Sequence, residues 1–112
     1  MSTDSNPTSG ESLPECTPDL EPGARCTIEM PDDSMEPRIR PGAPLCVEII
    51  DPEGYVTDGI YLFRMGGAAH VKRLQFRPNE IRVLPGDRYQ PFSVQREEIE
   101  LIGIVTAGIT RV

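Results

Sequence analysis

The chain has 112 residues, enough for one small domain, and none of its apolar stretches reaches the roughly 18 residues of a membrane-spanning helix. Its formal net charge of −7 excludes the basic surface expected of an autonomous DNA-binding domain. Because the N-terminus also lacks a signal-peptide pattern, we expect a soluble, cytoplasmic protein that does not contact a membrane.

The first quarter of the chain is polar and rich in proline, serine and threonine. Residues 1–26 contain five acids and one arginine, and so contribute −4 of the net charge of −7. Such a segment buries too little apolar surface to offset the entropy lost on ordering. We therefore predict a disordered acidic linker or tail at residues 1–26 and one folded domain at residues 27–112.

The cysteines and glycines give no sign of a cofactor. Cys16, Cys26 and Cys46 are odd in number and have no CxxC spacing, so neither a disulfide framework nor a zinc site is expected. The chain also lacks the glycine patterns of nucleotide-binding loops. We expect no metal and no other cofactor, and we expect Cys46, which lies in an apolar run, to be a small core residue.

From Thr27 onward, short apolar runs alternate with turn signals, and no segment has the helical period of 3.6 residues. This pattern predicts a mainly β domain with little helix. The expected strands are residues 27–30, 45–50, 59–64, 68–76, 81–84, 92–94 and 99–109.

The last of these strands is long and strongly apolar, with Gly103 and Gly108 marking expected bends or bulges. Its apolar surface exceeds what one sheet face needs. Two interpretations stay open, a contribution to a dimer interface and burial on both faces within the chain.

Lys72 is the only lysine among the 11 basic residues. Strand alternation places it on one face with His70, Leu74 and Phe76. A lysine that loses contact with water can lose its proton and act as a base, which an arginine cannot do. The alternatives are a lysine that reaches out to solvent and, for His70, either a base or a histidine satisfied by its neighbours.

Ser34 lies 38 residues before Lys72, in the sequence Asp32-Asp33-Ser34-Met35-Glu36-Pro37. A serine together with a neutral lysine is a known nucleophile and base. A sharp turn here would expose the hydroxyl and offer the backbone amides of Ser34 and Met35 as oxyanion donors. The alternative is that Ser34 is an ordinary turn or cap residue.

These two motifs, with Pro41-Gly42 between them, resemble the LexA-type family of self-cleaving peptidase domains, which includes the C-terminal domains of phage repressors and the UmuD proteins. The Met-Pro-Asp-Asp-Ser-Met sequence at residues 30–35 is most similar to the phage-repressor branch. The resemblance spans roughly residues 27–112 and also includes residues 58–61 and 102–105.

The resemblance implies that Ser34 is the nucleophile and Lys72 the general base of a Ser-Lys dyad. It implies a LexA/signal-peptidase-like assembly of coiled β-sheets, usually dimeric. Members of the family cut their own linker at an Ala-Gly or Cys-Gly bond when stimulated by the RecA filament. A membrane signal peptidase with the same dyad does not fit, because no spanning segment is present.

The chain departs from the family pattern at two places. We expect no Ala-Gly or Cys-Gly target bond anywhere in this chain; in relatives the target bond would fall just before Met1. The chain then corresponds to a post-cleavage fragment, a C-terminal piece, or a short member without its target. The second departure is at residues 85–91, where only Tyr89 and Pro91 match the usual loop, so the form of this loop stays open.

The sequence therefore predicts the C-terminal dimerisation and latent autoproteolysis domain of a phage-type or SOS-type transcriptional repressor. The alternative is a processed, UmuD-like accessory protein that binds a DNA polymerase or the RecA filament without present catalysis. The expected partners are a second copy of the chain and the RecA filament. DNA would be bound only through an N-terminal domain absent from this chain.

Overall fold

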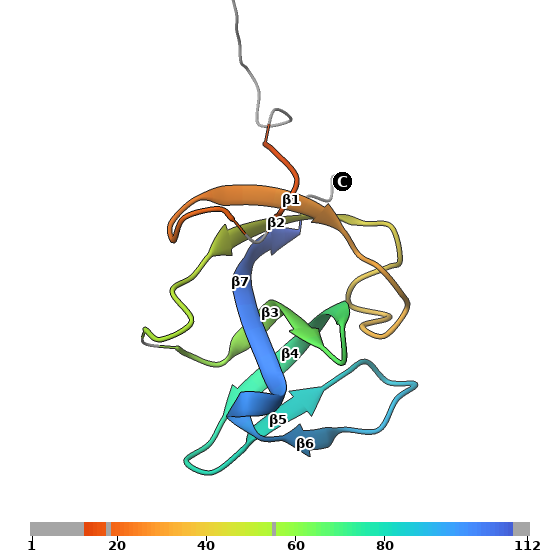
Figure 1. Ribbon diagram of the computed structural model, residues 1–112. Helices are drawn as coiled ribbons and strands as arrows, with labels where there is room; N and C mark the ends of the chain where they lie inside the picture. The colour runs from red at the N-terminus through yellow and green to blue at the C-terminus, as the bar shows by residue number, and fades with distance from the viewer. Residues whose placement is uncertain (1–12, 18, 55, 109–112) are drawn as a thin grey trace, which may run out of the picture.

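The computed structural model describes residues 13–17, 19–54 and 56–108, which form seven strands in one antiparallel sheet (Figure 1). The strands are β1 (Arg25–Glu29), β2 (Pro44–Ile49), β3 (Gly59–Met65), β4 (Ala68–Phe76), β5 (Ile81–Leu84), β6 (Phe92–Val94) and β7 (Ile99–Gly108). Their order in the sheet is β1-β2-β7-β3-β4-β5-β6. The prediction of a mainly β fold with little helix is confirmed.

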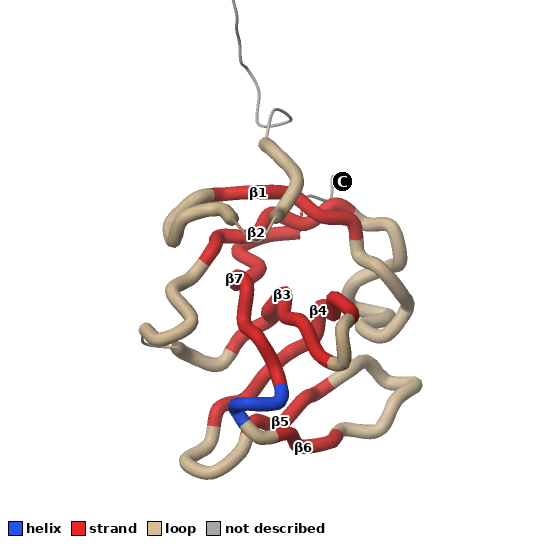
Figure 2. The backbone as a smooth tube through the Cα atoms, viewed as in Figure 1, coloured by secondary structure: helices blue, strands red, loops and turns tan. Residues whose placement is uncertain are grey.

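Helical structure in the described residues is limited to a short 3-10 turn at Arg96–Glu98, immediately before β7 (Figure 2). No helix in this part of the chain is long and apolar enough to cross a membrane.

Strand β7 joins the two ends of the molecule, running from the β5–β6 end to the β1–β2 end in Figure 1. Its C-terminal half pairs with β2 and its N-terminal half with β3. The register shifts along both pairings, because Thr106 and Ile102 are extra residues on β7. Such bulges increase twist and bend the strand. At Gly103 a Cβ would lie 2.5 Å from Val47 Cγ1, so close packing requires the glycine there.

The bent sheet encloses two hydrophobic cores. The first contains Cys26, Met30, Met35, Leu45, Val47, Ile49, Leu62 and Val71. The second contains Tyr61, Phe63, Leu74, Ile81, Val83, Val94, Ile99 and Leu101. Strands β3 and β4 contribute to both, so their two faces are covered. Burial on both faces places Lys72 of β4 in a largely apolar environment.

The apolar side chains of β7 also pack within the chain. Ile102 and Val105 contact the first core, whereas Ile99, Leu101 and Ile104 belong to or contact the second. The structure thus favours burial of both faces of β7 within the chain over an apolar face left for a dimer partner. Ile109, which was also expected in the strand, lies outside the described residues.

The packed part of the chain begins earlier than residue 27. Cys16, Leu20 and Ala24, which were expected in the tail, contact the first core. Residues 14–16 run parallel to β1, where the amide of Cys16 donates to the Thr27 carbonyl (3.1 Å) and that of Thr27 to the Pro14 carbonyl (2.8 Å). Free hydrogen-bonding groups at the edge of β1 thus order a segment of low hydrophobicity. Residues 1–12 of the tail predicted at residues 1–26 lie outside the described residues.

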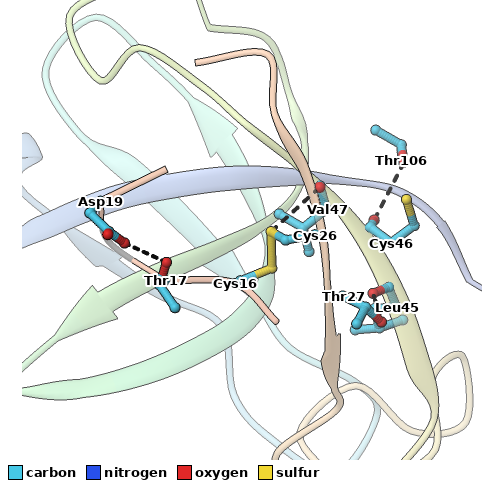
Figure 3. Close-up of a disulfide and its surroundings, with 9 residues drawn as sticks. All are labelled: Cys16, Thr17, Asp19, Cys26, Thr27, Leu45, Cys46, Val47 and Thr106. Carbon is cyan, nitrogen blue, oxygen red and sulfur yellow. Dashed lines mark hydrogen bonds between the residues drawn. A yellow bond between two sulfur atoms is a disulfide. The ribbon is translucent and has the colours of Figure 1, made fainter. Parts of the chain in front are cut away.

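The expectation of no disulfide is wrong, because Cys16 and Cys26 form one (Figure 3). The parallel segment brings their Cα atoms to 4.8 Å, within the range that disulfides span. The odd cysteine count is explained by Cys46, which is free and half-buried at the β2–β7 pairing. The count therefore could not exclude a single bridge, and Cys46 is less buried than a core residue.

Candidate active site

Ser34 lies in the loop from Met30 to Ala43 that joins β1 to β2. The ends of this loop are tied by two hydrogen bonds of 2.8 Å, from the Met30 amide to the Ala43 carbonyl and from the Gly42 amide to the Met30 carbonyl. The side chains of Met30 and Met35 are buried in the first core. The two buried methionine side chains and the hydrogen bonds between the loop ends therefore hold the turn that carries Ser34 in a defined position.

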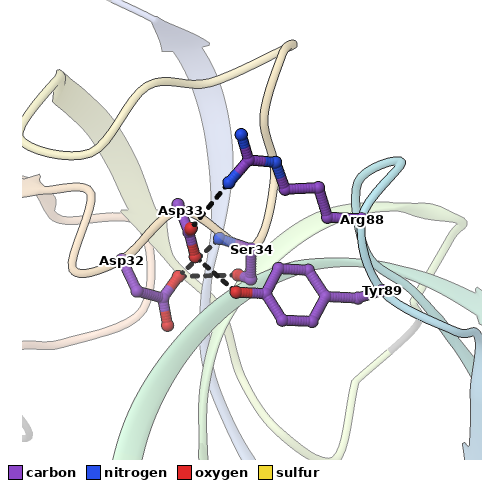
Figure 4. A network of polar contacts seen from close by, with 5 residues as sticks. All are labelled: Asp32, Asp33, Ser34, Arg88 and Tyr89. Carbon is purple, nitrogen blue, oxygen red and sulfur yellow. Dashed lines mark hydrogen bonds and ion pairs between the residues drawn. The ribbon is translucent and has the colours of Figure 1, made fainter.

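Within this turn, the carboxylate of Asp32 contacts Ser34 twice (Figure 4). Asp32 Oδ1 accepts a hydrogen bond from the Ser34 amide at 3.0 Å and another from the Ser34 hydroxyl at 2.7 Å. An aspartate that binds the amide two residues on is a common turn-forming arrangement. In this conformation the Ser34 amide, one of the two predicted oxyanion donors, is occupied by Asp32. The second, the amide of Met35, belongs to the same turn.

The loop between β5 and β6 packs onto the serine turn. The amide of Gly86 donates to the Ser34 carbonyl at 2.5 Å, and the amide of Asp87 donates to the Glu36 carbonyl at 3.2 Å. A Cβ on Gly86 would lie only 2.1 Å from the Glu36 carbonyl oxygen. The two backbones therefore touch, and a glycine at residue 86 is what allows it.

Side chains of the same loop reach Asp33, the residue before the serine (Figure 4). The Tyr89 hydroxyl donates to Asp33 Oδ1 at 2.5 Å, and Arg88 forms an ion pair with the other carboxylate oxygen at 3.8 Å. The two neighbouring aspartates thus have different roles: Asp33 holds the β5–β6 loop, and Asp32 holds the serine. The sequence did not reveal these contacts, although the match of Tyr89 to the family pattern was a signal for one of them.

Lys72 lies on β4 opposite Tyr61 of β3, in a position that leaves its side chain only 8% exposed. Its Nζ lies 3.2 Å from Nδ1 of His70. The His70 ring in turn stacks on Phe63, with ring centroids 5.7 Å apart. His70 is therefore satisfied by its neighbours, which agrees with the simpler of the two interpretations offered for it.

Ser34 and Lys72 are the two buried polar or charged side chains in the part of the chain that the structure describes. Burial lowers the pKa of Lys72, and the charge of Asp32 partly opposes this shift. Burial also lowers the pKa of His70, with a further lowering from the charge of Lys72. Burial thus shifts the protonation equilibrium of Lys72 towards its neutral, basic form.

Asp32 connects the serine with the lysine. Burial tends to raise its pKa, but the hydrogen bonds from Ser34 and the charges of Lys72 and His70 outweigh it and lower the pKa. These mutual effects place Asp32, Ser34, Lys72 and His70 in one polar cluster. In this conformation the Ser34 hydroxyl donates to Asp32, and Lys72 contacts His70.

A groove of about 440 Å³ lies beside the serine turn. One wall is the turn itself, from Met35 to Arg38, and the opposite wall is the loop of Pro85, Gly86 and Asp87; Arg73 and Leu84 complete it. The groove is large enough to accept side chains of an extended peptide next to Ser34.

The expectation that no Ala-Gly bond occurs anywhere in the chain is wrong, because Ala107 and Gly108 form one. This dipeptide lies in β7, where the two residues pair with Cys46 and Leu45 of β2. Because a peptide bond within a sheet ladder is held away from a nucleophile, we do not regard it as the cleavage target.

The fold and the cluster together define a small antiparallel β domain with a serine turn packed beside a buried lysine. The family model described as "Peptidase S24-like" matches residues 2–106. The chain belongs to the Peptidase S24-like family. It is also 33% identical over 85 residues to the 26 kDa repressor protein of Escherichia phage HK022, a match that covers 75% of this chain and 36% of that protein. The chain therefore corresponds to about a third of this repressor's length.

Proposed function

We propose that this chain is the C-terminal dimerisation and latent autoproteolysis domain of a phage-type repressor, with Ser34 as nucleophile and Lys72 as general base. The observation that carries the proposal is the burial of one serine and one lysine in a single cluster of a Peptidase S24-like domain. Burial of a charged group costs stability, and groups with shifted pKa values concentrate at functional sites.

The proposed reaction begins when Ser34 turns its hydroxyl from Asp32 towards neutral Lys72. Lys72 takes the hydroxyl proton as the oxygen attacks the peptide carbonyl, and the backbone amides of Ser34 and Met35 stabilise the resulting oxyanion. Lys72 then gives its proton to the leaving amine. An acyl-enzyme on Ser34 remains, and water releases it with Lys72 again acting as base.

The proposed substrate is a linker peptide ahead of the domain, presented by the same polypeptide at high effective concentration. We propose that this peptide lies in the groove lined by Met35 and the residues that follow it in the serine turn. We further propose a homodimer and stimulation by the RecA filament. Both roles rest on the resemblance of residues 30–35 and 71–74 to the LexA-type family.

A serine-directed fluorophosphonate tests the dyad without a peptide substrate, because phosphonylation of Ser34 can be followed by intact mass. The expected result is a single added phosphonyl group on the wild-type chain and none on Ser34→Ala. Lys72→Arg keeps the positive charge but removes the base, so labelling should slow by roughly 10²–10⁴-fold, the usual contribution of a general base.

The matched control is Arg73→Lys, which places a lysine on the exposed neighbour of Lys72 without altering the buried position. In combination with Lys72→Arg it should not restore labelling. Labelling of Lys72→Arg at the wild-type rate would contradict the proposed base and would favour a binding module on the same fold.

A further inference from the structure

We propose that Asp32 is a positioning residue that holds Ser34 in a resting state, and that its carboxylate must withdraw before Ser34 can attack a peptide. This inference rests on the proposed function, since it assigns the control of the same nucleophile. Asp32 is not proposed to bond to Lys72 or to the substrate. One of its carboxylate oxygens contacts both groups of Ser34 that catalysis needs, the hydroxyl and the amide.

The geometry of the two hydrogen bonds carries the argument. Asp32 Oδ1 accepts from the Ser34 hydroxyl (2.7 Å) and from the Ser34 amide (3.0 Å). A reacting peptide needs the same two groups, the first as nucleophile and the second as oxyanion donor. The carboxylate oxygen therefore occupies a position that the substrate oxygen has to take, and the two compete for Ser34.

The exposure of the two residues shows how the restraint can be released. Ser34 is buried, whereas Asp32 is exposed to solvent. A carboxylate that leaves Ser34 can therefore be solvated by water, and the turn itself stays fixed by Met35 and by the hydrogen bond from Gly86. The nucleophile can be freed by a side-chain rotation, without movement of the core.

Release of Asp32 also affects the base. The charge of Asp32 raises the pKa of Lys72 against the effect of burial. When the carboxylate moves away, the neutral form of Lys72 becomes more favourable. Three titratable groups face Lys72: Asp32 from the serine loop, His70 from its own strand and Tyr61 from β3. Asp33 forms its ion pair with Arg88 instead.

The test compares rates of fluorophosphonate labelling at Ser34 for the wild type, Asp32→Asn and Asp32→Ala. Loss of a hydrogen bond to a charged acceptor should accelerate labelling of Asp32→Ala by about tenfold or more, with Asp32→Asn between it and the wild type. Asp33→Asn is the matched control. It removes one negative charge from the adjacent residue but neither bond to Ser34, so it should not accelerate labelling.

A second readout follows the pH titration of the Lys72 side chain by NMR, with isotope-labelled lysine. The midpoint should fall from the wild type to Asp32→Asn, because the substitution removes the charge that raises the pKa of Lys72. Circular dichroism and the unfolding midpoint establish that each variant is folded. Asp32→Asn keeps the side-chain shape and serves as the test variant if Asp32→Ala unfolds.

Faster labelling of the Asp32 variants together with a lower Lys72 midpoint supports the proposal. Labelling that is unchanged, slower or absent in every folded protein overturns it, as does an unaltered midpoint. The titration midpoint of Lys72 in the wild-type protein then tests the proposed function separately. A lowered value retains Lys72 as the base without the Asp32 restraint, and an ordinary value removes the dyad as well.

Discussion

At the scale of single residues, the site depends on how closely two backbones approach. Gly86 has no positive backbone φ angle, so a side chain there is excluded by space and not by conformation. The atoms that a Cβ would meet are the carbonyl of Glu36 and the backbone of Met35. These are backbone atoms of the serine turn, which cannot move aside without moving Ser34.

Gly86→Ala is therefore expected to destabilise the domain by about 1–3 kcal/mol, the usual cost of overpacking, and to slow labelling of Ser34. Urea denaturation gives the stability and intact mass gives the labelling rate. Gly59→Ala is the control, because its Cβ would meet side-chain atoms and no backbone, the nearest being the tip of Ile104 at 3.3 Å. Equal effects of the two substitutions would show that the contact between Gly86 and the turn has no special role.

At the scale of elements, the segment before β1 is the part that the sequence described least well. Its composition predicts disorder, and its few apolar residues give no strand pattern. Its order arises from pairing with Thr27 of β1 and from the disulfide between Cys16 and Cys26. Both are contacts between separate parts of the backbone, so local composition could not reveal them.

Reduction of this disulfide should lower the free energy of unfolding by about 2–3 kcal/mol, as expected for a closed loop of 10 residues. The comparison is best made in Cys46→Ser, which removes the free thiol as a competing partner. Urea denaturation with and without reductant measures the difference. Cys16→Ser combined with Cys26→Ser should be insensitive to reductant, and equal stability of oxidised and reduced protein would contradict the account.

At the scale of the whole molecule, two cores on opposite faces of β3 and β4 explain why a lysine is buried in so small a domain.

Most of the fold was predictable from sequence, since alternation and turn residues gave all seven strands to within two residues at each described end. Ser34 and Lys72 could be selected as candidates because the lysine is unique and the motif is recognisable. The contacts of Asp32 and Gly86 were not, because they depend on a side-chain rotamer and on the packing of two distant loops.

Burial of Lys72 is expected to reduce stability, which gives a prediction for the whole domain. The pKa of Lys72 is lowered in the folded state, so below its ordinary value the unfolded chain binds more protons. Stability of the wild type should therefore rise with pH as that ordinary value is approached. Lys72→Met should be more stable than the wild type at pH 7, and the difference should shrink towards pH 10.

Urea denaturation of both proteins between pH 7 and pH 10 measures this trend. Arg73→Met, at the exposed neighbouring position, should show no comparable dependence on pH. A constant difference between wild type and Lys72→Met across this range would mean that the lysine keeps its charge in the folded protein.

The most direct test of the account uses the single lysine of the chain. With isotope-labelled lysine, the side-chain resonance of Lys72 can be followed against pH in the wild-type protein and in Ser34→Ala. The account predicts a midpoint clearly below the ordinary value of 10.5, because burial outweighs the charge of Asp32. A midpoint at or above 10.5 would contradict it, since a lysine that keeps its proton at neutral pH cannot be the base that activates Ser34.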